Sequence, residues 1–220
     1  MARLCASAQR IRARPPCQRP PTARRWASLR RVSQKTPRVK GVAFRSVMNS
    51  AENLRGPGTR ERCYDAMDRE VADPLRYGQL IPSGWYPIGW YKAMWAGVLA
   101  GTSGGPELVK QVGYECMRLD TGGVYRLVMR LLSPETVFAA SSRFYSSYYD
   151  TGSLTIVARG PGFARAAWKG CIGFNRTMWS EVIASGEALV ELAGGKQPRH
   201  RVIEGGRDGD PDTISELRWR

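Results

Sequence analysis

The sequence predicts an α+β fold, in which a helical N-terminal part is followed by a small antiparallel sheet. Up to about residue 149, apolar residues recur at the three- and four-residue spacings of helices. Beyond this point, short runs rich in β-branched and aromatic residues flank turns of Gly, Pro and Asp. Segregated helices and strands are typical of α+β proteins rather than of doubly wound sheets. The second half is therefore predicted to run hairpin–helix–hairpin.

The ordered chain is expected to begin at Val39, with the apolar and β-leaning segment VKGVAFRSVMNS. After the turn Gly56–Gly58, Thr59 can cap a helix. Asp73-Pro74 is predicted to end this helix, because the residue before a proline disfavours helical geometry. One side of the helix carries Cys63, Met67 and Val71.

The aromatic stretch Ser83–Trp95 leads into the next predicted helix, with Pro87 in its first turn. The wide apolar face of this helix carries Trp90, Met94 and Val98, with Tyr91, Trp95 and Leu99 alongside. Gly101–Gly105 is predicted to be a turn between helices, and Pro106 opens the second one. The face of that helix carries Leu108, Val112, Cys116 and Leu119.

The later elements have strong boundary signals. Ser133-Pro134-Glu135 combines a capping hydroxyl, a proline in the first turn and an acid near the helix dipole, and predicts a helix to about Tyr149. SLTIVAR and FARAAWKG form a predicted hairpin around a Gly-Pro-Gly turn. Asn175 can cap the following helix, which Gly194-Gly195 ends. RHRVIEGG and TISELRW are the last predicted strands, around the turn RDGDPD.

The net charge of +15 is concentrated at the N-terminus. Residues 1–40 contain twelve Lys or Arg and no acidic residue, which leaves 22 basic against 19 acidic residues in 41–220. We therefore expect residues 1–38 to be a disordered basic leader and residues 39–220 to be one α+β domain. The leader composition also suits a misassigned start, with Val32 or Met48 as the alternative beginning. A transit peptide or a phosphate-binding arm are further interpretations.

Several features favour a cytoplasmic protein without a membrane span. The five cysteines are isolated, odd in number and not spaced for zinc, as in a reduced protein. The leader lacks the apolar region of a secretory signal. The longest apolar stretch, Ile88–Gly101, is short and contains Lys92.

No motif indicates an enzyme, a metal site or a cofactor. Gly101–Gly105 matches G-x-S-x-G, but a predicted helix rather than a strand precedes Ser103. The single histidine, His200, lies between two arginines in a predicted strand and cannot form a zinc site alone. A haem-ligating histidine usually lies in an apolar helical pocket, so haem binding through His200 is not expected.

Two aromatic clusters are the candidate ligand-binding residues. Large rings at helical spacing are first of all core residues, and this is the default interpretation of both clusters. If a pocket exists, one wall is predicted from Trp90, Tyr91 and Trp95, and the facing wall from Phe144, Tyr145 and Tyr148. Arg143 is the cation beside the second cluster and could meet an anionic ligand.

The chain from Val39 to Trp219 resembles an uncharacterised paralogous family that is expanded in myxobacteria. The residues that carry the resemblance are Lys40–Phe44, Trp85–Pro87, Ser133-Pro134 and the terminal VIEGGRDGDPDTISELRW. The ending is also similar to four-vinyl-reductase domains and to the haem–nitric-oxide-binding-associated group. That resemblance implies a helical part followed by an antiparallel sheet, in a module that binds small molecules or proteins.

This sequence departs from those families at two places. Cysteines that often flank the last hairpin are replaced here by Ile203 or Glu204 on one side and by Thr213 on the other. The helical histidine of haem-based nitric-oxide sensors has no counterpart, because the single histidine belongs to the terminal strands. The resemblance therefore implies neither a metal or thiol site nor haem sensing.

The sequence favours a non-enzymatic, cytosolic regulatory or sensory domain that binds a small apolar ligand or a partner protein, including a second copy of itself. The alternative is a nucleic-acid-associated protein that acts through its basic N-terminal arm. An enzyme that uses Ser103 is a third hypothesis, without support from any local pattern.

Overall fold

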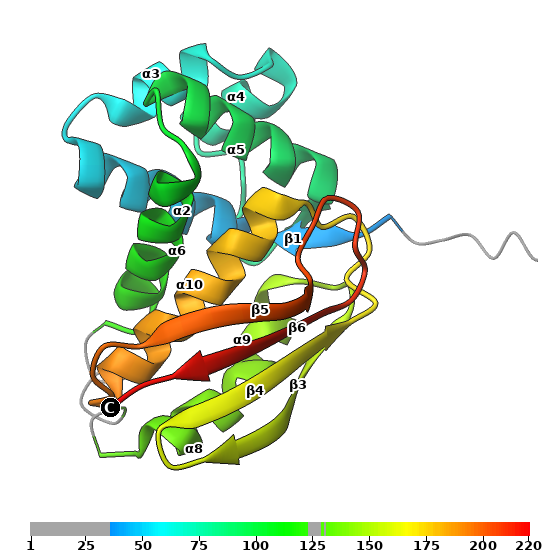
Figure 1. Ribbon diagram of the computed structural model, residues 1–220. Helices are drawn as coiled ribbons and strands as arrows, with labels where there is room; N and C mark the ends of the chain where they lie inside the picture. The colour runs from blue at the N-terminus through cyan, green and yellow to red at the C-terminus, as the bar shows by residue number, and fades with distance from the viewer. Residues whose placement is uncertain (1–35, 123–128, 130) are drawn as a thin grey trace, which may run out of the picture. The chain divides into compact units, whose positions relative to one another are not determined.

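The computed structural model describes residues 36–122, 129 and 131–220, and Figure 1 traces the order of their helices and strands. Residues 36–220 form one compact unit. The elements of the helical part are β1 (Arg38–Lys40), α2 (Gly41–Arg55), α3 (Thr59–Asp65), α4 (Arg69–Arg76), β2 (Trp85–Pro87), α5 (Ile88–Gly101) and α6 (Pro106–Asp120). Those of the second part are α8 (Pro134–Ala139), α9 (Ser141–Tyr148), β3 (Ser153–Gly160), β4 (Phe163–Lys169), α10 (Arg176–Leu192), β5 (Arg199–Gly205) and β6 (Thr213–Arg218). The α+β class is confirmed.

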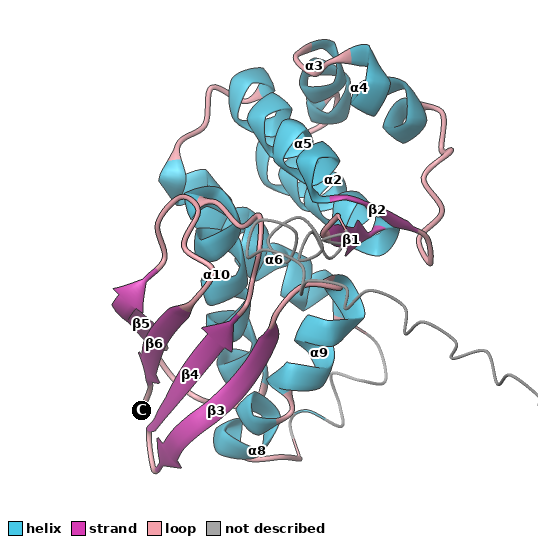
Figure 2. Cartoon of the chain, turned by 90° about the vertical axis from the view of Figure 1, so that its right-hand side faces the viewer, coloured by secondary structure: helices cyan, strands magenta, loops and turns pink. Residues whose placement is uncertain are grey.

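The main sheet is antiparallel, with the strand order β3-β4-β6-β5. The two predicted hairpins are confirmed, and they are joined by pairing of β4 with β6, for example Ala166 with Ser215. Figure 2 shows α8 and α9 beside β3, while α10 packs against α6 and α8 and reaches β5. One face of the sheet is therefore covered by α8, α9 and α10.

A second, two-stranded sheet ties the start of the unit to its middle. In it, β1 pairs with β2, and Val39 also forms a bridge to Tyr149 just after α9. Arg38 holds this junction, because its backbone N–H and its Nε donate to the two carboxylate oxygens of Asp150, at 2.6 and 2.7 Å. β1 therefore links the helical part directly to the end of α9.

The β-leaning start expected at Val39 is limited to β1, and a helix follows it that was not predicted. Only β1 is extended, and α2 begins at Gly41. Phe44, Val47, Met48 and Ala51 are all buried and have the i, i+3, i+4, i+7 spacing of a helix face. No helix was predicted here, because the β-branched residues at the start concealed this period.

The predicted end at Asp73-Pro74 is wrong. The chain breaks earlier, at Ala66–Asp68, and α4 continues through Pro74 to Arg76. Pro74 has no N–H to donate and its ring crowds the preceding turn, but burial of Val71 and Ala72 keeps this short helix in place. The helix predicted from Pro134 to about Tyr149 is divided in two at Ala140.

Two further boundaries differ by one residue, because Gly58 rather than Thr59 is the N-cap of α3, and Pro87 ends β2 and is the N-cap of α5. Other boundaries agree with the prediction. Asn175 caps α10 by accepting a hydrogen bond from the Met178 backbone N–H, and Ser133 caps α8 in the same way through Thr136. Thr102–Gly105 forms the turn from α5 to α6. None of the described helices is both long and apolar enough to cross a lipid bilayer.

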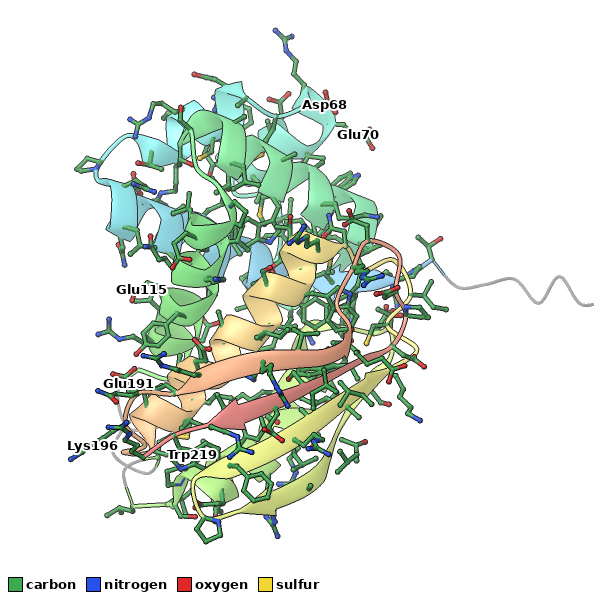
Figure 3. All side chains as sticks on the ribbon, in the orientation of Figure 1. Asp68, Glu70, Glu115, Glu191, Lys196 and Trp219 are labelled. Atoms are coloured by element: carbon green, nitrogen blue, oxygen red, sulfur yellow. The ribbon has the colours of Figure 1, made fainter. Side chains whose placement is uncertain are left out.

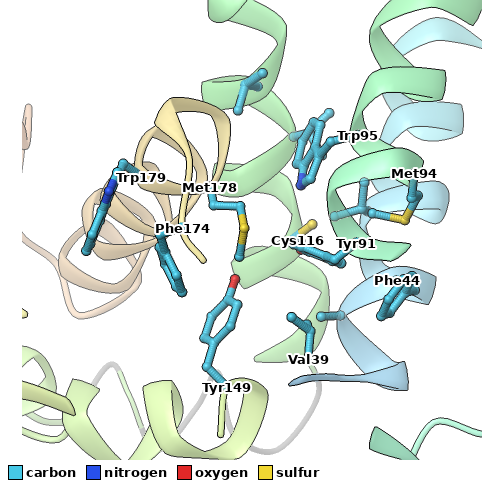
Figure 4. Packing of buried hydrophobic residues seen from close by; sticks show 14 of the residues in the cluster. Val39, Phe44, Tyr91, Met94, Trp95, Cys116, Tyr149, Phe174, Met178 and Trp179 are labelled. Atoms are coloured by element: carbon cyan, nitrogen blue, oxygen red, sulfur yellow. The ribbon is translucent and has the colours of Figure 1, made fainter. Parts of the chain in front are cut away.

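The core lies between α5, α10 and the helices around them. Figure 4 shows Tyr91 and Trp95 of α5 on one side, Phe174 and Trp179 on the other, and Met178 and Tyr149 between them. The ring of Tyr91 also packs edge-on against Phe44, with ring centroids 4.9 Å apart. Much of the aromatic stretch is thus core, as the default interpretation had it.

The backbones of α6 and α10 approach each other closely at Gly113. A Cβ at this position would lie 2.5 Å from the carbonyl oxygen of Glu181 and 2.9 Å from its Cα. Backbone atoms cannot move aside as a flexible side chain can, so a glycine is required here.

We predict that Gly113→Ala destabilises the protein by about 1–3 kcal/mol, because it forces α6 and α10 apart. The matched control is Gly89→Ala in α5, where an added Cβ meets no atom within 4 Å. The control should be as stable as the parent, or more so by about 0.5–1 kcal/mol. Urea denaturation measures both, and equal stabilities of the two variants would contradict the prediction.

Candidate functional site

A cavity of about 80 Å³ lies between the covered face of the sheet and the helices. Its wall is built by residues of α2, α6, α8, α9 and α10, together with single residues of β3, β4 and β5. Most of the wall is aromatic or aliphatic, but acidic and other polar side chains also reach it. A single water occupies about 30 Å³ in the liquid, and an engineered apolar cavity of about 150 Å³ accepts benzene. The cavity therefore has room for a compact molecule.

Glu181 brings a buried carboxylate to this cavity. It lies on α10, it is only 6% exposed, and both of its oxygens accept hydrogen bonds from α5. The Tyr91 hydroxyl donates to Oε1 at 2.5 Å and the Trp95 Nε1–H donates to Oε2 at 3.0 Å. The pKa of Glu181 is raised to about 7, mainly because the residue is buried. The two hydrogen bonds partly oppose this shift, and the nearby Asp120 adds to it. Such a shifted acid in a cavity is a common mark of a functional site.

Asp120, at the end of α6, is the second acidic residue of the wall. The Ser46 hydroxyl donates to its Oδ1 and the Tyr148 hydroxyl donates to its Oδ2, both at 2.7 Å. These donors come from α2 and α9, so Asp120 joins three helices around the cavity. Burial, followed by the charge of Asp120, raises the pKa of Tyr148 above its ordinary value, which keeps this hydroxyl protonated as a donor.

Two further polar side chains reach the wall without hydrogen-bond partners among the described residues. The side chain of His200 is 5% exposed, and neither ring nitrogen forms a hydrogen bond, although Nδ1 lies 3.5 Å from Oε1 of Glu187. The hydroxyl of Ser141, at the start of α9, is also buried and unpaired. Buried polar groups are nearly always satisfied by protein, water or ligand. These two groups therefore indicate that something polar occupies the cavity.

The sequence-predicted pocket residues occupy three kinds of position. Phe144, Tyr145 and Tyr148 line the cavity. Tyr91 and Trp95 lie in the core and touch the cavity only through their hydrogen bonds to Glu181. Trp90 lies on the outer side of α5, where its Nε1–H donates to Glu70 Oε1 at 3.2 Å, and Arg143 is exposed on α9.

The polar residues of the cavity were missed by sequence reasoning. Glu181 lies on the same helix face as Met178 and Leu189, so an acid on an apolar stripe was the available signal. Ser141 and His200 gave no local signal, because only the packing of α9 and β5 over the cavity makes them inward-facing.

The fold has clear counterparts among solved structures, although no protein-family profile and no curated protein matches this sequence. An oxygen-binding H-NOX domain related to soluble guanylate cyclases superposes with a TM-score of 0.60, 11% identity and coverage of 82% of this chain and 95% of that chain. An Fe(II) unliganded H-NOX protein from K. algicida gives a TM-score of 0.59 at 11% identity, with 82% and 96% covered. A structure from work on haem distortion in the H-NOX family gives 0.61 at 11% identity, with 82% and 95% covered. This chain therefore has an H-NOX-like fold, in line with the helical-part-then-sheet order that the haem–nitric-oxide-related resemblance implied.

We predict that the buried acid makes the protein less stable as the pH rises. The unfolded chain loses the Glu181 proton near the ordinary value of 4.5, whereas the folded chain keeps it until about 7. The contribution of Glu181 to the free energy of unfolding is therefore greatest below about pH 4.5. It falls by about 3 kcal/mol as the pH rises to about 7. In Glu181→Gln this contribution should disappear.

Urea denaturation at several pH values between 5 and 8 measures the difference between the parent and Glu181→Gln. Glutamine can accept from Trp95 and donate to the Tyr91 oxygen, so the variant should still fold. The control is Glu191→Gln, an exposed position at the end of α10 that is labelled in Figure 3. Its carboxylate accepts a hydrogen bond from the Tyr114 hydroxyl of α6, which the amide oxygen of glutamine can also accept. A parent and a Glu181→Gln variant with parallel stability–pH curves would contradict the prediction.

Proposed function

We propose that this chain is a non-enzymatic, cytoplasmic sensory domain that binds a small, largely apolar molecule in the cavity. The observation that carries the proposal is the cavity itself, with the unpaired and buried side chains of Ser141 and His200 on its wall. Leaving such groups unsatisfied costs about 1–3 kcal/mol each, which a bound molecule would recover. The predicted rings Phe144, Tyr145 and Tyr148 would contact its apolar part.

The likeness in fold supports a ligand-binding role. The solved structures with this fold include a domain that binds oxygen and several described through their haem. At 11% identity this likeness concerns the fold, so the ligand must be inferred from the residues of this chain.

The residues of this cavity do not fit a haem. A cavity of about 80 Å³ is far below the roughly 300–1,000 Å³ of ordinary ligand pockets, and a haem is a large ligand. His200 could offer a ring nitrogen, but its imidazole lies against Gly186, where an added Cβ would meet His200 Cε1 at 3.1 Å. Its ring also lies 6.5 Å from that of Phe138, so little space is left for a macrocycle beside it. We therefore propose a smaller ligand.

Glu181 offers a route from the cavity to the helical part. Its carboxylate faces the cavity, and its hydrogen-bond donors, Tyr91 and Trp95, belong to α5. A ligand that competes for this carboxylate would weaken or re-aim those two bonds. α5 could then shift relative to α10, which is the two-state element that a sensory domain needs.

A catalytic role has little support. Ser103, the serine of the G-x-S-x-G match, lies in the exposed turn between α5 and α6, with a positive φ of 48°. It is not among the residues that line the cavity.

We predict that Ser141→Met fills the cavity and prevents ligand binding, because the flexible thioether chain packs into irregular space. Full-length protein would be purified, denatured and extracted, and the released molecules compared by mass spectrometry with those from Ser146→Met. Ser146 lies on the same helix but is exposed, so that variant should keep the ligand. The parent should release a small molecule and show no haem absorption band.

The ligand-binding proposal would be refuted if the parent protein releases no small molecule, elutes as a monomer and gives the same extract as Ser141→Met. A haem band in the visible spectrum would refute the proposed ligand size.

Nucleic-acid binding through the N-terminal arm is the second candidate, because residues 1–40 contain twelve basic residues and no acid. Such binding depends on counterion release, so it should weaken steeply with salt and show no sequence preference. We predict that deletion of residues 1–35 abolishes DNA binding in a fluorescence titration between 50 and 200 mM salt. Unchanged affinity after the deletion would exclude this role.

A further inference from the structure

The acidic residues of the cavity have no cationic partner within the part of the chain that the structure describes. Glu181 and Asp120 both line the cavity, while no lysine or arginine belongs to its wall. The hydrogen-bond donors to the two carboxylates are hydroxyl and indole groups, which carry no charge. Glu181 is buried, whereas Asp120 is exposed and lies where the cavity meets the surface. A buried acid is usually paired with a cation, so Glu181 beside a cavity without one is an unusual arrangement.

The hydrogen bonds hold the two carboxylates in place without saturating them. A carboxylate can accept about four hydrogen bonds, and each of these two accepts two from the protein. Both therefore retain acceptor capacity. They are held by side chains of α2, α5 and α9, so a ligand would meet preorganised acceptors at both positions, although Asp120 is exposed.

Aromatic rings cover much of the remaining wall. The rings that line the cavity belong to Phe138, Phe144, Tyr145, Tyr148, Tyr149 and Trp168. The face of an aromatic ring attracts a cation, and this attraction is stronger away from water. The same rings accommodate an alkyl chain, so the wall suits a molecule that is cationic at one end and apolar at the other.

Independent of the acids, two buried polar side chains indicate a ligand. The Ser141 hydroxyl and the ring nitrogens of His200 belong to cavity-lining residues, are at least nine-tenths buried and have no hydrogen-bond partner among the described residues. They come from α9 and β5, whereas the acids come from α6 and α10. They could bind a hydroxyl or carbonyl group of a ligand whose amine lies at the acids.

We propose that the cavity selects a compact organic amine in its protonated, ammonium form. This inference rests on the proposed ligand-binding function and names the class of its ligand. The ammonium group donates to Glu181 and Asp120 and completes the charge balance of the cavity. Its alkyl part lies against the aromatic rings. The small volume limits the ligand to a few carbon atoms, unless the cavity widens on binding.

The test uses three probes of equal chain length: propylammonium, 1-propanol and propionate. Each is titrated into the full-length protein at pH 8, and amide chemical shifts are followed by NMR. Propylammonium should bind at least tenfold more tightly than 1-propanol, and propionate should not bind. In Glu181→Gln and in Asp120→Asn, this preference for the cation should fall at least several-fold, whereas Glu191→Gln should keep it. Asp120→Asn serves as the second variant should Glu181→Gln fold poorly.

The outcomes separate the two proposals. Equal binding of propylammonium and 1-propanol that is lost in Ser141→Met would overturn the amine inference and leave the ligand-binding function standing. Tighter binding of propionate would overturn the inference in the same way. If no probe binds, the amine inference fails, and the extraction experiment on the parent and Ser141→Met then decides the function separately.

Discussion

The interaction on which this structure depends is the pair of hydrogen bonds from α5 to the carboxylate of Glu181. An acid in the interior must either keep its proton or find donors, since an isolated buried charge is very costly. Tyr91 and Trp95 supply those donors from a helix far away in the sequence. Their geometry fixes how α5 lies against α10, and Gly113 lets α6 approach the same turn of α10. Glu181 is thus one of the residues that join the helical part to the part that contains the sheet, and it also faces the cavity.

The aromatic residues between positions 85 and 95 do not line one pocket together. They have separate structural roles. Tyr91 and Trp95 are core residues with polar ends directed at an acid. Trp85 lies in β2, where Lys40 Nζ lies 4.8 Å from the centre of its ring. Trp90 lies on the outer side of α5 beside Tyr86. The aromatic residues of this segment therefore contribute to the core, to a strand pair and to the partly buried edge of the core.

Much of the fold could be predicted from the sequence, because its signals are local. The caps at Ser133 and Asn175 and the Gly-Pro-Gly turn act within a few residues, and they placed α8, α10 and the first hairpin. The errors arose where tertiary packing overrode a local preference, as at Pro74, which burial of its neighbours keeps in a helix. The candidate site was harder to predict, since Glu181, Asp120 and His200 meet only after distant elements pack together. The one sequence signal for this site was an acid, Glu181, on the apolar face of α10.

The strand order has a consequence for how the protein acquires its cavity. The hairpins β3–β4 and β5–β6 can each form locally, but the sheet is completed only when β6 pairs with β4 across the intervening helix α10. Such a non-local pairing is entropically costly and belongs to the slow steps of folding. His200 reaches the wall through β5, so the wall is incomplete until that step has occurred. A molecule that needs the finished wall would bind the native state alone and would slow unfolding rather than guide the early collapse.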